Sequence, residues 1–146
     1  VKPGNFIFGA RPNDRNLLYV IDFGLTKVYR HNRKHVALKY GRSMLGTARF
    51  ASVHVHEGLS PSRRDDIESV GYIIVYLLLG ELPWQHIDGE DSITMVTMKR
   101  EEALWDLLRE SGVSPHLIEF MKYPRGLQYE ETPDYQYLVG LLENAL

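Results

Sequence analysis

The chain has 146 residues, of which 44% are hydrophobic and 25% are charged, and its formal net charge is −2. This composition is typical of a folded domain with a core of its own. The near balance of charge gives no general attraction for nucleic acid or for an anionic membrane. The sequence contains no cysteine, which excludes disulfides, zinc–thiolate sites and cysteine nucleophiles.

Two short apolar runs near the start of the chain predict a β-hairpin. Phe6–Phe8 and Leu17–Ile21 flank a polar loop of residues 9–16. Residues 24–61 are polar and have no sustained period, which predicts a long irregular segment. Loops of this length inside a small domain are usually functional or disordered.

Helices are expected in the rest of the chain. The first begins near Ser62, is apolar on nearly every side after Val70, and stops at Gly80 and Pro83. A helix that is apolar all round is a central core element. Because its apolar stretch, residues 70–79, is interrupted by Gly71 and is too short to span a bilayer, we expect it to be buried in protein.

Three further helices follow this central one in the prediction. One covers residues 91–110, with the inward positions Met95, Met98, Ala103, Leu104 and Leu107. Another starts at Ser114 and Pro115 and runs to about Tyr123. The segment "TPDYQYLVGLLENAL" (residues 132–146) repeats the same start signal and predicts a last amphipathic helix. The predicted fold is therefore mainly α with one small β-hairpin.

Candidate metal ligands flank the hairpin. Asp22 follows the second apolar run, Asn5 precedes the first, and Gly24 permits an unusual backbone turn after Asp22. Carboxylate and amide oxygens suit Mg²⁺, which usually takes further oxygens from phosphates. Lys2 lies three residues before Asn5 and could neutralise a phosphoryl group. Each of these residues alone is most often an exposed loop residue, but the combined pattern is far more specific.

Other polar residues offer weaker candidates. His54 and His56 could ligate a metal, but two alternating histidines without a third ligand are usually a surface feature. Arg49, together with Arg63 and Arg64, could bind an anion, since arginine suits phosphate recognition. The alternative is that these arginines form ion pairs with neighbouring acidic residues.

The motifs that carry the chemistry resemble those of protein kinases. "KPGN" (residues 2–5) is similar to the end of the catalytic loop, and "DFG" (residues 22–24) is similar to the metal-binding motif. "GTARFAS", "SRRDDIES" and "LPWQ" look like the casein kinase 1 group, although this chain reads Ser52-Val53-His54 where that group has a Ser-Ile-Asn type segment. The resemblance covers residues 1–146 and implies the C-terminal lobe of the α+β protein-kinase fold.

The resemblance implies a role for each matching residue. Lys2 would contact the transferred phosphate, and Asn5 and Asp22 would hold Mg²⁺ with ATP. Thr47 would hydrogen-bond near the catalytic base, and the position matching Arg49 helps to bind a phosphate or sulfate. The structural positions implied are Phe23 in the regulatory spine, Gly24 beside it, and a buried Asp66 that holds backbone amides of the catalytic loop.

The resemblance also implies what the chain lacks. The general base, an Asp, would sit immediately before Val1, and the nucleotide-binding lobe would lie further upstream. We therefore expect a partial kinase domain, residues 1–146, that begins inside the catalytic loop and is inactive alone. A second hypothesis is a non-catalytic, pseudokinase-like module that docks partner proteins; the intact Lys2, Asn5 and Asp22 favour the enzyme.

The implied setting is that of a serine/threonine kinase inside the cell, in the cytoplasm, the nucleus or both. Its cofactors would be ATP and Mg²⁺, and its partners protein substrates rather than nucleic acid or membrane. The segment after "LPWQ" reads "HIDGEDSITMV" and is acidic where the family supplies lysines. This difference argues against a preference for primed or acidic substrates.

Overall fold

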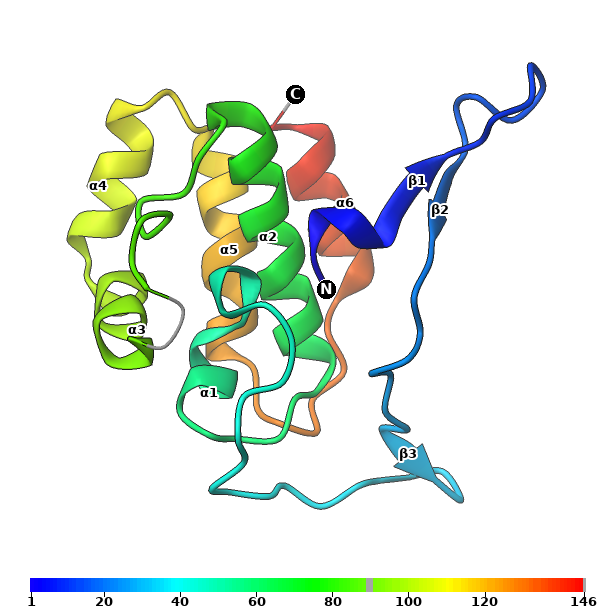
Figure 1. The fold of residues 1–146 in the computed structure, drawn as a ribbon, viewed down its shortest axis with the longest axis vertical. Helices are drawn as coiled ribbons and strands as arrows, with labels where there is room; N and C mark the ends of the chain where they lie inside the picture. The colour runs from blue at the N-terminus through cyan, green and yellow to red at the C-terminus, as the bar shows by residue number, and fades with distance from the viewer. Residues whose placement is uncertain (89–90, 146) are drawn as a thin grey trace.

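The computed structural model describes residues 1–88 and 91–145, and its helices gather around one central helix, α2 (Figure 1). The chain begins with a short 3-10 turn, η1 (Pro3–Asn5), and an antiparallel strand pair, β1 (Phe6–Phe8) and β2 (Leu18–Val20). Ile7 lies opposite Tyr19 in this pair. The hairpin expected from the sequence is confirmed, and it reaches out to one side of the helices (Figure 1).

The segment predicted to be irregular contains more structure than expected. Strands β3 (Arg30–His31) and β4 (Lys34–His35) form a second antiparallel pair. The turn between them places both Asn32 (φ 48°) and Arg33 (φ 66°) in the left-handed region. Two consecutive left-handed residues make a tight hairpin turn, which asparagine tolerates well. The expectation of a wholly irregular segment is therefore wrong here.

Two short helical segments also lie in that region. The 3-10 turn η2 (Ala48–Phe50) is followed by α1 (Val53–His56). Ser52 caps α1, because its hydroxyl accepts a hydrogen bond from the Val55 N–H at 3.2 Å. A four-residue helix has too few periodic positions to be recognised from hydrophobic spacing alone.

Helix α2 (Arg63–Leu79) begins and ends where the sequence predicts. The Ser62 N–H donates to Asp65 Oδ2 at 2.7 Å, and Gly80 ends the helix with φ 83°. Tyr72 and Val75 are fully buried, but Leu77 and Leu78 are 69% and 60% exposed. The prediction of burial on nearly every side thus fails in the last turn, where most of the surface of these two leucines faces solvent.

The helix predicted over residues 91–110 is two helices. α3 (Ser92–Arg100) ends at Glu101, whose ψ of 135° is extended, and α4 (Ala103–Glu110) begins two residues later. The break changes which positions face inward. Met95 and Leu104 are buried and Met98 is half-buried, as predicted.

The second half of that predicted helix has a different inward face. Ala103 and Leu107 are exposed, and Trp105 and Leu108 are buried instead. The extended residue between the helices shifts the phase of the second helix, so positions counted from the first no longer apply.

Helix α5 (Pro115–Gly126) starts as predicted, with the Ser114 hydroxyl accepting from the His116 N–H at 3.3 Å. It continues past Tyr123 and includes Pro124, so its predicted end was three residues early. A proline in the last turn removes only one helical donor.

Helix α6 (Tyr135–Glu143) begins later than "TPDYQYL" suggests. Asp134 is its N-cap and accepts from the Tyr137 N–H at 2.9 Å, so Thr132 does not cap this helix. Both residue types are good caps, and the sequence alone does not decide between them. The predicted helix also included residue 146, which lies outside the described residues.

The core forms where α2 packs on α5, with α6 on one side and α3 and α4 on the other (Figure 1). Close packing of α2 and α5 requires Gly71, because a Cβ there would lie 2.7 Å from Met121 Cγ. No helix among residues 1–88 and 91–145 is long and apolar enough to cross a membrane. The buried side chains of this core include Tyr72, Trp84, Met95, Trp105, Leu108, Leu117, Phe120, Met121 and Leu138.

Candidate functional site

A groove of about 450 Å³ lies between the start of the chain, the segment after β2 and the first turn of α2. The residues singled out in the sequence that line it are Lys2, Asn5, Asp22, Phe23, Thr47, Arg63 and Asp66. Residues from both ends of the hairpin thus share the groove with Thr47 and Asp66, which lie at least 25 positions away in the sequence.

The strand pairing brings Asn5 and Asp22 together. The Ile21 N–H donates to the Asn5 carbonyl at 2.8 Å, which extends the β1–β2 pairing by one step and leaves Asp22 next in the chain. The Asn5 side chain is oriented by its Oδ1, which accepts from the Lys2 N–H at 3.1 Å. A three-residue turn therefore holds Lys2 and Asn5 in one fixed arrangement.

Asp22 has an unusual backbone conformation. Its φ is 64°, in the left-handed region that most residues avoid. Its carboxylate has one weak hydrogen bond, with Oδ1 accepting from the Gly24 N–H at 3.4 Å. Strained residues of this kind cluster at functional sites, and this one leaves a carboxylate open to the groove.

The oxygen atoms of Asn5 and Asp22 fit a magnesium ion. The second lone pair of Asn5 Oδ1 and both carboxylate oxygens are hard donors of the kind that Mg²⁺ prefers. The described residues contain no group of three or more His, Cys, Asp or Glu side chains that could hold a metal by themselves. An ion here would therefore need further oxygens, which phosphate groups supply.

Thr47 and Asp66 line the groove from the helical side. Thr47 is exposed and directly precedes η2. Asp66 is also exposed, so the buried position implied by the resemblance is not seen. Desolvation of its carboxyl is the main cause that raises the pKa of Asp66 above its ordinary value.

Phe23 and Gly24 complete the segment after Asp22. Phe23 lines the groove but is 66% exposed, so the described residues do not provide the packing that a place in a regulatory spine implies. Gly24 contributes the N–H that contacts the Asp22 carboxylate. This segment lies at the surface with its phenyl ring largely uncovered.

The three arginines considered as an anion site have separate partners. Arg63 donates to the carbonyls of Glu130 and Glu131 at 2.7 and 3.1 Å, and Arg64 donates to the Leu127 carbonyl at 2.5 Å. Both therefore fasten the start of α2 to the α5–α6 connection. An anion site shared with Arg49 remains a prediction.

Arg49 is half-buried in η2. One of its guanidinium nitrogens donates to the Gln85 carbonyl at 3.4 Å, a long contact that leaves most of its donors unused among the described residues. Its role at an anion site remains a prediction.

The two histidines of α1 do not converge on a metal site. His56 Nε2 lies 3.0 Å from the Ala48 carbonyl and 3.0 Å from Lys99 Nζ. His54 Nδ1 lies 3.9 Å from Asp65 Oδ1. Burial lowers the pKa of both rings, that of His56 to about 4, so both are neutral at neutral pH. The metal interpretation of this pair is not supported.

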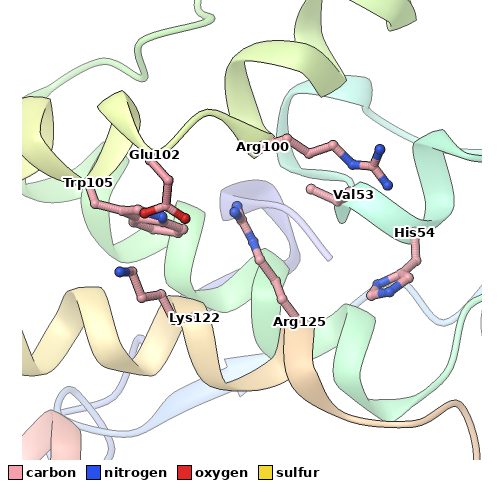
Figure 2. A pocket seen from close by; sticks show the side chains of 7 residues that line it. All are labelled: Val53, His54, Arg100, Glu102, Trp105, Lys122 and Arg125. Carbon is pink, nitrogen blue, oxygen red and sulfur yellow. The ribbon is translucent and has the colours of Figure 1, made fainter.

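A second cavity, of about 360 Å³, contains none of the residues predicted to handle phosphate (Figure 2). Its cations are largely neutralised, because Arg100 pairs with Glu57, and Arg125 Nε lies 3.0 Å from Glu68 Oε1. The residues that line it are Val53, His54, Arg100, Glu102, Trp105, Lys122 and Arg125.

A buried polar network was not anticipated from the sequence. Glu68 is 1% exposed, and its Oε1 accepts from the Tyr72 hydroxyl at 2.5 Å and from Arg125 Nε at 3.0 Å. Lys99, fully buried on α3, lies beside it. The available signal was Lys99 itself, four residues after the inward Met95 and so on the same face of the helix.

Comparison with known proteins identifies relatives over the whole chain, although no protein-family profile matches it. Casein kinase I homolog 1 of Schizosaccharomyces pombe is 38% identical over 152 aligned residues, which cover 100% of this chain and 34% of that protein. Casein kinase I homolog 3 of Saccharomyces cerevisiae is 39% identical, covering 92% of this chain and 27% of that protein. A probable casein kinase I homolog of Encephalitozoon cuniculi is 41% identical, covering 100% and 48%.

The chain thus spans between about a quarter and a half of the length of these relatives. The mainly helical structure with small antiparallel strand pairs agrees with the lobe that the motifs implied. Sequence similarity and fold lead to one assignment: this chain belongs to the casein kinase I group of the protein kinase superfamily.

Proposed function

We propose that this chain is part of a serine/threonine protein kinase that transfers the γ-phosphate of ATP to protein hydroxyls. The observation that supports this most is the groove in which Lys2, Asn5, Asp22 and Thr47 meet. The left-handed Asp22 adds to it, because backbone strain is retained where the surrounding structure needs one geometry.

Each residue has a proposed task in phosphoryl transfer. The Asp22 carboxylate and the Asn5 amide oxygen would hold Mg²⁺, which would supply positive charge beside the ATP phosphates. The Lys2 ammonium stabilises charge that develops on the transferred phosphoryl group. Thr47 orients the acceptor side of the groove, where the substrate hydroxyl has to approach.

We further propose that the 146 residues do not transfer phosphate by themselves. The resemblance assigns the general base to an Asp outside them, and without a base and an adenine-binding surface the two substrates are neither activated nor positioned. The proposed partners are protein substrates, in the cytoplasm or the nucleus.

Docking of a partner protein without catalysis is the second candidate function. The β1–β2 hairpin supports it, because Phe8 is 69% exposed and Leu17 and Leu18 are each more than half exposed. Exposed apolar surface of this kind marks an interaction site. A docking module does not need the Asn5–Asp22 ligand pair, so the metal site separates the two functions.

Paramagnetic Mn²⁺ tests this site on the chain itself. With Mn²⁺ and ATP, the amide NMR signals of Asn5, Phe23 and Gly24 should broaden before those of α5. Asp22→Asn should remove this selectivity, whereas Asp106→Asn, an exposed carboxylate on α4, should leave it intact. Uniform broadening in the wild-type chain would contradict the proposed metal site.

A further inference from the structure

Lys99 is a lysine with no exposed surface, which is rare because burying an ammonium is costly unless it is hydrogen-bonded. Its Nζ donates to the carbonyls of Ala48 and Ala51 at 3.2 and 2.7 Å. A third neighbour, His56 Nε2, lies 3.0 Å away. In the tautomer of His56 that carries its proton on Nδ1, Nε2 is an acceptor, and the ammonium then has one acceptor for each of its three N–H bonds.

Aromatic rings and a carboxylate surround this ammonium. Nζ lies 4.9 Å from the ring centroids of both Tyr72 and Trp84, which favours a cation over their faces. The charged groups nearby are Glu68 on α2 and Arg125 on α5. Since Glu68 and Arg125 pair with each other, the charge of Lys99 is left without a carboxylate of its own.

The backbone that Lys99 holds is the η2 turn. Within the turn, the Phe50 N–H donates to the Thr47 carbonyl and the Ala51 N–H to the Ala48 carbonyl, both at 3.1 Å. A side chain outside the turn also binds its backbone, because Trp84 Nε1 donates to the Arg49 carbonyl at 2.8 Å. Side chains far along the chain therefore fix this turn, and Thr47, which directly precedes it, lines the groove.

We propose that Lys99 is a positioning residue: it anchors the Ala48–Ala51 turn and thereby sets where Thr47 lies in the groove. The substrate-orienting consequence rests on the function proposed above, but the anchor itself does not. Lys99 touches neither the groove nor the metal ligands, since it is absent from the residues that line the groove, and it acts through the backbone that it binds.

His56 allows this anchor to work in two protonation states. Burial lowers the pKa of Lys99 to about 7, with Glu68 opposing the shift and Arg125 adding to it. When charged, Lys99 donates to two carbonyls and to the Nε2 lone pair of His56. When neutral, it donates to both carbonyls and accepts from His56 Nε2–H, after the imidazole proton has moved from Nδ1 to Nε2.

Hydrogen exchange at the turn tests the anchor in the 146-residue chain without any need for catalysis. In Lys99→Met, which keeps the apolar stem but has no donor, the Phe50 and Ala51 amides should exchange at least about tenfold faster. Lys122→Met is the matched control, because the Lys122 ammonium also lies over a tryptophan, 5.0 Å from the Trp105 ring (Figure 2), but has no hydrogen bond to a carbonyl among those the structure gives. It should leave both amides unchanged.

A donor at position 99 should restore protection. Lys99→Gln carries an N–H₂ group and should bring the exchange of both amides back to within about threefold of wild type. A role in packing alone predicts the reverse, with Met preserving protection and Gln losing it. Unchanged exchange in Lys99→Met would overturn the proposal.

Two further outcomes are decisive. If Lys99→Met also loses protection throughout α5, the fold as a whole is weakened and Lys99→Gln alone decides. A tenfold faster exchange of the Phe50 and Ala51 amides in Lys99→Gln would then overturn the proposal. In the wild type, protection of the turn corrected for intrinsic exchange should not fall between about pH 6 and pH 9. A tenfold loss above neutrality would overturn the part assigned to His56, whatever the chain's activity.

Discussion

Removing the charge of Glu68 should destabilise the fold more than any surface substitution. Glu68 is 1% exposed and accepts hydrogen bonds from Tyr72 and Arg125. In Glu68→Gln the volume is kept, but the largely buried Arg125 guanidinium is left without its carboxylate partner. Breaking a buried pair by neutralising one partner costs roughly 3–5 kcal/mol.

The amide oxygen of the glutamine side chain in Glu68→Gln still accepts one hydrogen bond, so we expect the lower end of this range, about 3 kcal/mol. For a domain of this size that loss corresponds to a Tm lowered by about 10 °C. Urea unfolding followed by circular dichroism measures the free energy of unfolding directly.

The control for this experiment is Glu110→Gln, at the exposed end of α4, which should change the unfolding free energy by less than about 0.5 kcal/mol. If Glu68→Gln stays within that same limit, the network around Glu68 does not stabilise the fold, and the reasoning is refuted.

Three further predictions concern packing and pH. Gly71→Ala should cost about 1–2 kcal/mol of unfolding free energy, because its Cβ would approach Met121 Cγ to 2.7 Å; equal stability would show that Met121 moves freely. Gly140→Ala, with nothing within 4 Å on α6, should instead stabilise the chain by up to about 1 kcal/mol, and a loss in urea unfolding would contradict this. The folded-state pKa of Lys99, about 7, lies below its ordinary 10.5, so between these values the unfolded chain binds one more proton and the unfolding free energy should rise by about 1.4 kcal/mol per pH unit. Lys99→Met should lack this rise between about pH 7.5 and 9.5, and parallel pH profiles for both proteins would count against the assignment.

Local rules account for the elements that the sequence predicted correctly. The β1–β2 hairpin, both ends of α2 and the start of α5 follow from short-range signals: alternating apolar runs, a glycine in the left-handed region after Leu79, and a serine before Pro115. Such signals depend on neighbours within one or two turns, which the sequence displays directly.

The incorrect predictions arise where tertiary contacts decide. Glu101 is extended between α3 and α4 although both flanking segments favour helix, and hydrophobic spacing contains no sign of such a break. The burial of Lys99 depends on carbonyls about 50 residues away in the sequence. Neither feature has a local cause that could be read in advance.

The candidate site could be predicted from the sequence only in part. The pairing of β1 with β2 makes the proximity of Asn5 and Asp22 predictable from the hairpin. That Thr47 lines the same groove was expected only through the resemblance to kinases. The exposure of Phe23 and Asp66 differs from what that resemblance implied, because burial depends on which segments cover a residue.

The most direct test of the proposed function is phosphorylation of casein by the protein expressed from the full reading frame that contains this chain. With labelled ATP and Mg²⁺, the wild-type protein should incorporate phosphate into serine or threonine. Asp22→Asn should lower the rate by about a hundredfold or more, because the ligand charge that offsets Mg²⁺ is lost. Its unfolding free energy should remain that of the wild type, since Asp22 is exposed. Equal turnover in wild type and Asp22→Asn at saturating ATP and Mg²⁺ would contradict the role of this carboxylate, and no incorporation by the wild-type protein would contradict the kinase function itself.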